Sequence, residues 1–327
     1  MGKQQRMWRD VASSEITPED VYRSRRQFLT LAGASIGAGL LAACGQSAAS
    51  QPAATGGTAP AQPSALYGSG TKDEIGDAAN SFEQISTYNN YYEFSTNKEA
   101  VHTLATGFKT DPWTISVDGL VTKPQTFAIE DLRKQFGEEE RVYRLRCVEG
   151  WSMVIPWLGF PLAKLLAASE PKAEAKYVRF ESVSRPEEMP GQNDIFAYSW
   201  PYVEALRLDE AMNELALMVT GMYGKPLPTQ NGAPLRLALP WKYGFKSAKA
   251  LVKITLTADQ PKTFWTSANA SEYGFYGNVN PDVPHPRWTQ SSERRIGELS
   301  RRRTLKFNGY ERSVAALYKD LDLMANF

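Results

Sequence analysis

The chain has 327 residues, of which 42% are hydrophobic, so it is long enough to bury one large core or two small ones. Its formal net charge is +1, and residues 1–44 carry six of its 37 Lys and Arg and four of its 36 Asp and Glu. The remaining 31 basic and 32 acidic residues argue against a general nucleic-acid binder, which needs a basic face. The usual zinc site takes three or four Cys and His ligands, which two His and two Cys can barely supply, so we expect a metal to bring its own ligands or to use carboxylates.

The N-terminal segment predicts an export signal. Arg25 and Arg26 are followed by Phe-Leu and then by an apolar run rich in Gly and Ala, residues 31–43. The run is too short and too weakly apolar for a membrane span, which takes about 20 apolar residues. Paired arginines ahead of such a run are typical of a twin-arginine signal; the alternative is a buried helix with basic flanks. This route exports proteins that are already folded, and proteins commonly need it when a cofactor is inserted in the cytoplasm. The signal therefore also favours a protein with a buried redox cofactor.

Cys44 lies at the end of this run in the sequence Leu-Ala-Ala-Cys-Gly, which resembles a lipobox. Lipidation of Cys44 and ordinary cleavage nearby both stay open. The following Ala, Ser, Gly, Pro, Gln and Thr residues predict a disordered tether. We therefore expect a signal peptide at 1–44, a tether at 45–74 and a catalytic domain at 75–327. The mature chain is expected in the periplasm or on the extracytoplasmic face of the membrane, with Cys44 as a candidate lipid anchor.

Alternating and helical patterns predict a mixed body after the tether. In chain order we expect a strand at 113–117, helices at 129–136 and 162–168, and a strand at 177–180. A helix at 202–212, strands at 235–239 and 251–257, and a final helix at 313–323 follow. The helix at 129–136 should end at Gly137, and the first strand should end at an Asp-Gly turn. Strands dominate and helices are scattered, so the pattern indicates an α+β fold.

Cys147 is the single cysteine left if Cys44 is removed or lipidated. In a strand, Arg144 and Arg146 share the face opposite Cys147, and two nearby arginines would favour the thiolate, which ligates metals. A buried structural cysteine is the plain alternative. A thiol redox enzyme is another, although it needs a resolving cysteine or a nearby histidine. Glu149 shares the side of Cys147 if the strand continues, and could equally be a surface carboxylate.

The nine residues from Arg144 to Ser152, RLRCVEGWS, resemble the cofactor-cysteine segment of sulfite-oxidase-like molybdoenzymes. More closely, the chain resembles the molybdenum-containing catalytic subunits of periplasmic protein-methionine-sulfoxide reductases, over about residues 85–327. The further matching blocks are 88–94 (YNNYYEF), 109–113 (KTDPW), 230–236 (QNGAPLR), 240–246 (PWKYGFK), 272–276 (EYGFY) and 307–310 (FNGY). Any one block is weak, and their order and spacing together make the resemblance specific.

The resemblance implies a sulfite-oxidase-like molybdopterin-binding fold with mixed sheets, and a molybdenum–molybdopterin cofactor. Cys147 would be the protein thiolate on the metal. The residues implied to contact the cofactor are Asn89, Tyr92, Glu93, Ser182, Asn231, Arg236, Ser247, Ala248 and Lys249. Lys242 and Lys246 add positive charge in the same stretch as Arg236 and Lys249, which suits a phosphate and an anionic dithiolene. A solvated basic face is the alternative for these charges.

The implied activity is reduction of methionine sulfoxide, protein-bound and free, by oxygen-atom transfer at molybdenum, which would repair oxidised extracytoplasmic proteins. The implied electron donor is a haem-containing membrane subunit. About fifty residues follow position 276, too few for an immunoglobulin-like dimerisation domain, so we expect a monomeric subunit. Two other functions stay open: a sulfite dehydrogenase of the same fold, and a metal-free lipoprotein binding module.

Overall fold

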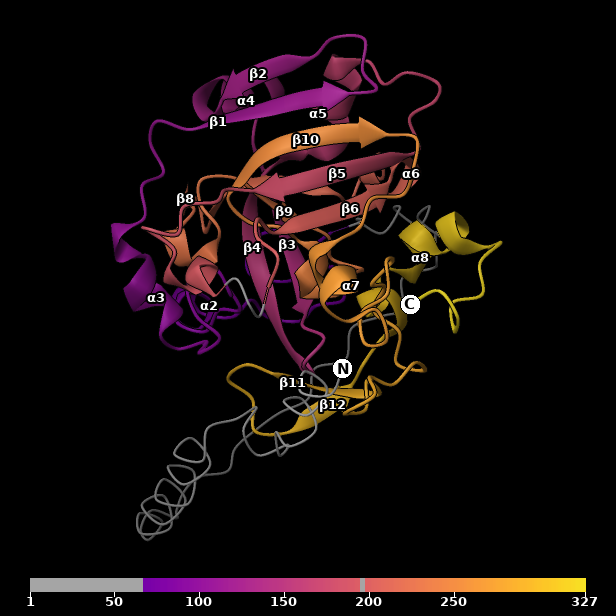
Figure 1. Cartoon of the computed structure of the whole chain (residues 1–327). Helices are drawn as coiled ribbons and strands as arrows, with labels where there is room; N and C mark the ends of the chain where they lie inside the picture. The colour runs from indigo at the N-terminus through magenta and orange to yellow at the C-terminus, as the bar shows by residue number, and fades with distance from the viewer. Residues whose placement is uncertain (1–66, 195–197) are drawn as a thin grey trace, which may run out of the picture. The chain divides into compact units, whose positions relative to one another are not determined.

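The computed structural model describes residues 67–194 and 198–327. They lie in a compact unit that spans Pro63–Phe327. The predicted signal peptide, Cys44 and most of the predicted tether lie outside the described residues. Within the described ranges, no helix has the length and apolar character needed to cross a bilayer. The unit is built around two β-sheets with short helices around them (Figure 1).

The first sheet is mixed and has five strands. In spatial order these are β2 (Gln125–Ala128), β1 (Thr114–Gly119), β10 (Leu251–Thr257), β5 (Tyr177–Ser182) and β6 (Val203–Arg207). β1 and β10 run parallel, and the other neighbours are antiparallel. Because side chains alternate between the faces of a strand, β1 buries Ile115 and Val117 and leaves Ser116 partly exposed.

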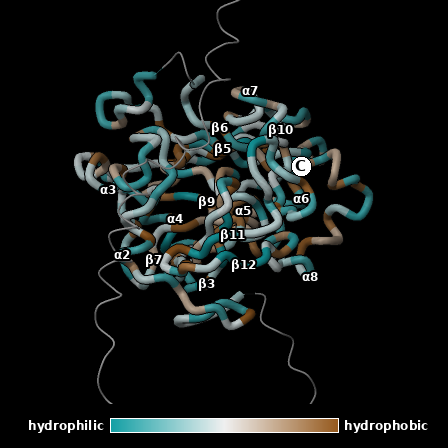
Figure 2. The backbone as a smooth tube through the Cα atoms, turned by 90° about the horizontal axis from the view of Figure 1, so that it is seen from below, coloured by the Kyte–Doolittle hydropathy of each residue, from teal (hydrophilic) through white to brown (hydrophobic). Residues whose placement is uncertain are grey.

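The second sheet is also mixed and is centred on the long strand β4. Its members are β12 (Arg301–Arg303), β11 (Ser292–Arg295), β4 (Trp151–Pro161), β7 (Leu217–Met222) and β8 (Lys225–Pro226), with β3 (Glu139–Arg146) paired to β4 and β9 (Arg236–Ala238) paired to β7. Nearly every residue of β4 is buried, as expected for a strand covered on both faces. Figure 2 shows hydrophobic segments gathered around α5, β7 and β9.

Seven α-helices lie in the described ranges, all of them short. They are α2 (Phe82–Ser86), α3 (Val101–Leu104), α4 (Ile129–Phe136), α5 (Leu162–Ser169), α6 (Leu208–Ala211), α7 (Phe264–Asn269) and α8 (Glu311–Val314). The 3₁₀ turns are η1 (Ala105–Gly107), η2 (Pro190–Asn193), η3 (Thr229–Asn231), η4 (Gly244–Lys246), η5 (Lys306–Gly309) and η6 (Ala315–Tyr318). α4 and α5 both pack against β4, and α4 ends at Gly137, whose φ of 68° suits glycine.

These elements confirm the predicted α+β class with mixed sheets, and they correct two predicted helices. The helix predicted at 202–212 is wrong in its first half, because β6 pairs with β5 and only α6 is helical. Pairing along a sheet edge outweighs local helix propensity here. The helix predicted at 313–323 is replaced by α8 and η6, since Val314 has a φ of −129° and breaks the helix.

The packed body begins ahead of Ile75. Gly68 forms a bridge with Val142 of β3, and Asp73 lies buried against Arg144. Residues 67–74, assigned to the tether from sequence, therefore contact the sheet that carries Cys147.

Candidate functional site

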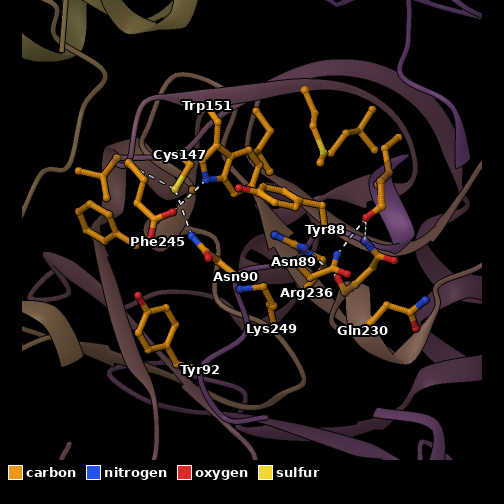
Figure 3. A pocket seen from close by; sticks show the side chains of 18 of the residues that line it. Tyr88, Asn89, Asn90, Tyr92, Cys147, Trp151, Gln230, Arg236, Phe245 and Lys249 are labelled. Carbon is orange, nitrogen blue, oxygen red and sulfur yellow. Dashed lines mark hydrogen bonds between the residues drawn. The ribbon is translucent and has the colours of Figure 1, made fainter. Parts of the chain in front are cut away.

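A cavity opens where the β3–β4 hairpin meets other segments of the chain. Figure 3 shows its side chains pointing inward from elements that are far apart in the sequence. The lining residues are Ile85, Tyr88, Asn89, Asn90, Tyr92, Glu93, Leu145, Cys147, Val148, Glu149, Trp151, Met153, Ile155, Trp157, Tyr202, Gln230, Asn231, Arg236, Gly244, Phe245, Lys249, Trp265 and Tyr273. The cavity thus gathers seven of the ten residues that the sequence predicts for the site.

Cys147 occupies the four-residue turn between β3 and β4. Its backbone N–H donates to the carbonyl of Trp151, and Gly150 closes the turn with a φ of 83°, which favours glycine. The thiol faces the cavity and is 6% exposed. Its Sγ accepts hydrogen bonds from Asn90 Nδ2 at 3.2 Å and from the backbone N–H of Glu149 at 3.5 Å. The turn therefore presents one sulfur atom to the cavity with two donors around it.

Burial, together with the nearby Glu149 carboxylate, raises the pKa of the Cys147 thiol to about 12. Lys98 and Arg146 act in the opposite direction and do not outweigh burial. The prediction that neighbouring arginines favour the thiolate is therefore right in direction for Arg146, but this effect does not keep the thiol ionised in the protein alone. A bound cation would have to supply that stabilisation, because a metal ion deprotonates a coordinating thiol.

The two arginines are committed elsewhere, which explains this correction. Arg144 pairs with Asp73 at 2.9 Å and with Glu74 at 2.5 Å, and its guanidinium lies over the Tyr310 ring. Arg146 pairs with Glu293 at 3.0 Å. Both guanidinium groups are neutralised by carboxylates, so they lock the hairpin in place instead of charging the cavity.

Glu149 lies at the cavity wall beside the thiol. The strand does not continue through it, since β3 ends at Arg146. Its carboxylate pairs with Lys98 at 2.9 Å and accepts a hydrogen bond from Trp151 Nε1 at 3.0 Å. Of the two readings left open by the sequence, the structure supports the one that puts this carboxylate near Cys147.

Positive charge enters the cavity through Arg236 and Lys249. Among the described residues, neither has a carboxylate within ion-pair distance. Burial lowers the pKa of Arg236 to about 10, and burial together with Arg236 lowers the pKa of Lys249. Glu93 opposes the shift of Lys249 but does not outweigh burial. Two desolvated cations with no carboxylate in ion-pair contact are costly alone, so this end of the cavity suits an anionic group.

Lys242 and Lys246 do not contribute positive charge to the cavity, although their spacing in the sequence predicts that they would. Lys242 pairs with Glu210 at 2.6 Å and Lys246 with Glu204 at 2.5 Å, and all four side chains are buried. These pairs lie behind the wall of the cavity and serve the packing of η4 and α6.

Asn89 and Asn231 join two segments of the cavity wall. The side-chain amides of both donate to the carbonyl of Ile85, at 2.9 and 3.0 Å. Their Oδ1 atoms are buried and have no hydrogen-bond partner. Gly232 follows with a φ of 101°, and a Cβ there would lie 2.9 Å from Lys249 Cβ, so glycine lets Lys249 approach. The two unpartnered oxygens leave acceptors for a donor on a bound group.

Glu93 and Tyr92 also line the cavity. Glu93 is 3% exposed, and burial raises its pKa while Lys249 opposes the rise. The Tyr92 ring packs edge-on against Trp265 and Tyr198, with ring centres 5.2 and 5.9 Å apart. Tyr273 contacts Trp265 in turn, with ring centres 4.7 Å apart. One wall of the cavity is therefore aromatic.

Three predicted residues lie outside this lining. Ser182 is buried at the end of β5 with an unpartnered hydroxyl. Ser247 Oγ accepts from the N–H of Leu239, and the carbonyl of Ala248 accepts from the N–H of Leu237. Contact between these three residues and a cofactor stays a prediction.

The cavity contains several residues that are not among the ten predicted site residues. Asn90 is the most informative, because it contacts the thiol directly. The sequence places it as a polar residue in an aromatic run, which indicates a lined pocket but not a contact with the thiol. Tyr273 lies in the matching block 272–276, whereas Trp265 carried no comparable signal, since only the tertiary structure brings α7 to the hairpin.

Residues 102–265 match the family model described as the oxidoreductase molybdopterin binding domain. This match covers half of the chain. The chain belongs to this family. Among solved structures it is similar to the sulfane dehydrogenase SoxCD from Paracoccus pantotrophus, with 19% identity and a TM-score of 0.39. That match covers 47% of this chain and 40% of the other, so the chain spans less than half the length of that relative.

The cavity fits the cofactor of this family. Molybdopterin is anionic, and the cavity offers two cations with no described carboxylate in ion-pair contact, three unpartnered amide oxygens on Asn89, Asn90 and Asn231, and one thiol. No group of three or more His, Cys, Asp or Glu side chains in the described ranges could hold a metal ion by itself. A metal that arrives with its own dithiolene ligand needs only one protein thiol. The lining of the cavity therefore fits the molybdopterin group after which the family is described.

Proposed function

We propose that this chain reduces methionine sulfoxide, protein-bound and free, to methionine by oxygen-atom transfer. The molybdenum–molybdopterin centre supplies the oxygen-accepting metal and exchanges two electrons when bound. Cys147 is the protein ligand of the metal. Arg236 and Lys249 bind the anionic part of the cofactor, and Asn89 and Asn231 orient it.

The observation that carries the choice of substrate is the charge around the thiol. Arg236 and Lys249 are the only cations among the lining residues, and the cofactor uses both. Lys98, the next cation near the thiol, is neutralised by Glu149. A sulfite dianion would need a cation without a partner beside the metal, and the lining residues in the described ranges offer none beyond Arg236 and Lys249. Arg294, which acts on Tyr88 from outside the lining, does not face the cavity as a lining residue. A sulfoxide is neutral, so this environment favours it over sulfite.

The walls near the thiol also suit a thioether. Aromatic rings attract sulfur at their edges by about 0.3–1.5 kcal/mol, and Tyr92, Trp265 and Tyr273 provide such edges. The same rings exclude water, which strengthens every charge interaction in the cavity. These residues bind and orient a methionine sulfoxide side chain against the metal.

The electron donor and the location follow from the same proposal. Sulfoxide reduction consumes two electrons and two protons and releases water. We propose a haem-containing membrane subunit as the donor, oxidised extracytoplasmic proteins as substrates and a monomeric catalytic subunit. The twin-arginine sequence at Arg25 and Arg26 supports an extracytoplasmic location, with Cys44 as a candidate lipid anchor.

The test begins with molybdenum analysis of the exported protein made in a host with intact cofactor synthesis. Wild type should contain about one molybdenum per chain, and Cys147→Ser should lose it or change its coordination. Cys44→Ser is the matched control, because it removes the other thiol of the chain and should keep the metal. Loss of metal from both variants would show only a general effect of cysteine removal.

Substrate assays complete the test. The loaded enzyme should oxidise a reduced viologen dye when methionine sulfoxide is added, and it should not reduce an electron acceptor when sulfite is added. The opposite pattern would replace the proposal with sulfite dehydrogenation. A folded wild-type protein without molybdenum would replace it with a metal-free binding module.

A further inference from the structure

The β11–β12 hairpin has two faces with different charge environments. On one face, Glu293 lies opposite Arg302. Every charge on this face has a partner: Glu293 pairs with Arg146, Arg295 pairs with Asp77, and Arg302 pairs with Asp77 and Glu298. This face attaches the hairpin to the body of the protein.

The opposite face carries three arginines, Arg294, Arg301 and Arg303, which we call the arginine face. Arg294 lies directly across from Arg301, and Ser292 lies across from Arg303. Across the parts of the chain that the structure describes, none of the three has a carboxylate within ion-pair distance. Arg301 donates only to the hydroxyl and carbonyl of Ser292. Like charges directly opposite each other destabilise a strand pair, so this arrangement calls for an anionic partner.

The tip of the same hairpin is apolar at its most exposed point. Residues 297–300 are all exposed, and the side chain of Leu299 is 100% exposed. A leucine that protrudes fully beside three cations matches the two requirements of an anionic lipid surface, which are positive charge at the phosphates and an apolar group among the headgroups. Figure 1 shows β11 and β12 at the lower end of the view, away from β1 and β2.

We propose that the arginine face and Leu299 bind the surface of an anionic phospholipid membrane. Guanidinium groups bind phosphate through two parallel hydrogen bonds. The start of the described chain is tied to the same hairpin, because Asp77 pairs with both Arg295 and Arg302. β11 also pairs with β4 at Trp151, a residue of the cavity wall, so membrane binding holds the site close to the lipid surface. The proposal is independent of the sulfoxide substrate.

Co-sedimentation with lipid vesicles tests this surface directly. The protein is the full chain with Cys44→Ser, so that no lipid can be attached to it. It should bind vesicles that contain phosphatidylglycerol and phosphatidylcholine, and not phosphatidylcholine alone, with binding that weakens as salt rises. Each arginine near the membrane surface changes the partitioning of the protein between water and the vesicles by about 5-fold. Arg301→Glu with Arg303→Glu should therefore lower binding by more than about 25-fold.

Three further proteins make the result decisive. Lys134→Glu with Lys172→Glu changes the net charge by the same amount as the double arginine variant, at exposed positions outside the hairpin, and should bind vesicles as the parent protein does. Leu299→Ser should weaken binding to vesicles, and Arg303→Glu alone guards against a hairpin that fails to fold. Equal loss in the lysine control, or no dependence on phosphatidylglycerol, would overturn the proposal. Binding to polyglutamate as strong as to vesicles, with no effect of Leu299→Ser, would also overturn it and assign the face to an acidic protein.

Discussion

The side-chain amide of Asn90 donates a hydrogen bond to the Sγ atom of Cys147 over 3.2 Å, although 57 positions separate the two residues. Asn90 Oδ1 is buried and has no partner, so the amide is oriented by the sulfur alone. Donors to a metal-bound sulfur tune the metal and position its ligand. The thiol and its donor thus form one unit built from two distant segments.

Replacing Asn90 tests this unit. Asn90→Ala should keep molybdenum bound and lower kcat/KM for methionine sulfoxide by about 10- to 100-fold, because outer partners of a metal ligand have effects of that size. Asn193→Ala, an exposed asparagine with only local hydrogen bonds, should match wild type. Steady-state kinetics and metal analysis on the same samples check this. A wild-type rate in Asn90→Ala would show that the hydrogen bond has no role.

Cofactor retention should depend on Lys249. A hydrogen bond to a charged group contributes about 1.5–3 kcal/mol, so Lys249→Met should weaken cofactor binding by about 10- to 100-fold. Molybdenum per chain after extended dialysis reports this loss without any assay of activity. Lys253→Met is the matched control on the same segment, because Lys253 pairs with Asp118 at the surface. Equal retention in both variants would contradict the assignment of Lys249 to the cofactor.

The buried pair of Lys246 and Glu204 should matter for stability. Lys246→Met leaves the Glu204 carboxylate unpaired and should lower the free energy of unfolding by about 3–5 kcal/mol. The double variant with Glu204→Gln should recover part of this loss, because it removes the unpaired charge. Urea unfolding of the three proteins measures both effects. A single variant as stable as wild type would show that the pair is not desolvated as the structure indicates.

His285 should make the protein less stable in acid. Burial lowers its pKa to about 4, and Glu272 opposes this shift. The unfolded chain, with a histidine pKa of about 6.5, therefore binds more protons between these values, so stability rises with pH across this window and is lost as pH falls. His285→Gln should reduce the difference in unfolding free energy between about pH 7 and about pH 5 by the order of 2 kcal/mol. If the unfolding free energy of His285→Gln depended on pH as it does in wild type, protonation of His285 would not be the cause of the loss of stability in acid.

Part of the fold and site could be predicted because the deciding information is local. The helix at 129–136 carries its apolar spacing and its terminating Gly137 in one short stretch, and the strand at 251–257 carries its alternation. The segment around Cys147 likewise holds the thiol and its turn within a few residues. The helix predicted at 202–212 failed because its neighbour β5, which decides its state, lies far away in the sequence.

The sequence alone determined which chemical groups the protein has: a thiol at Cys147, a basic stretch from Arg236 to Lys249, and the residues of the molybdopterin-binding family. Only the tertiary structure decided which of these groups stay free for a cofactor. Lys246 and Lys249 are three positions apart, yet Glu204 neutralises the first while the second faces the cavity with no carboxylate of the described residues in ion-pair contact. The reason is physical: burial makes an unpaired charge costly, and whether a carboxylate lies within reach depends on segments that only folding brings together.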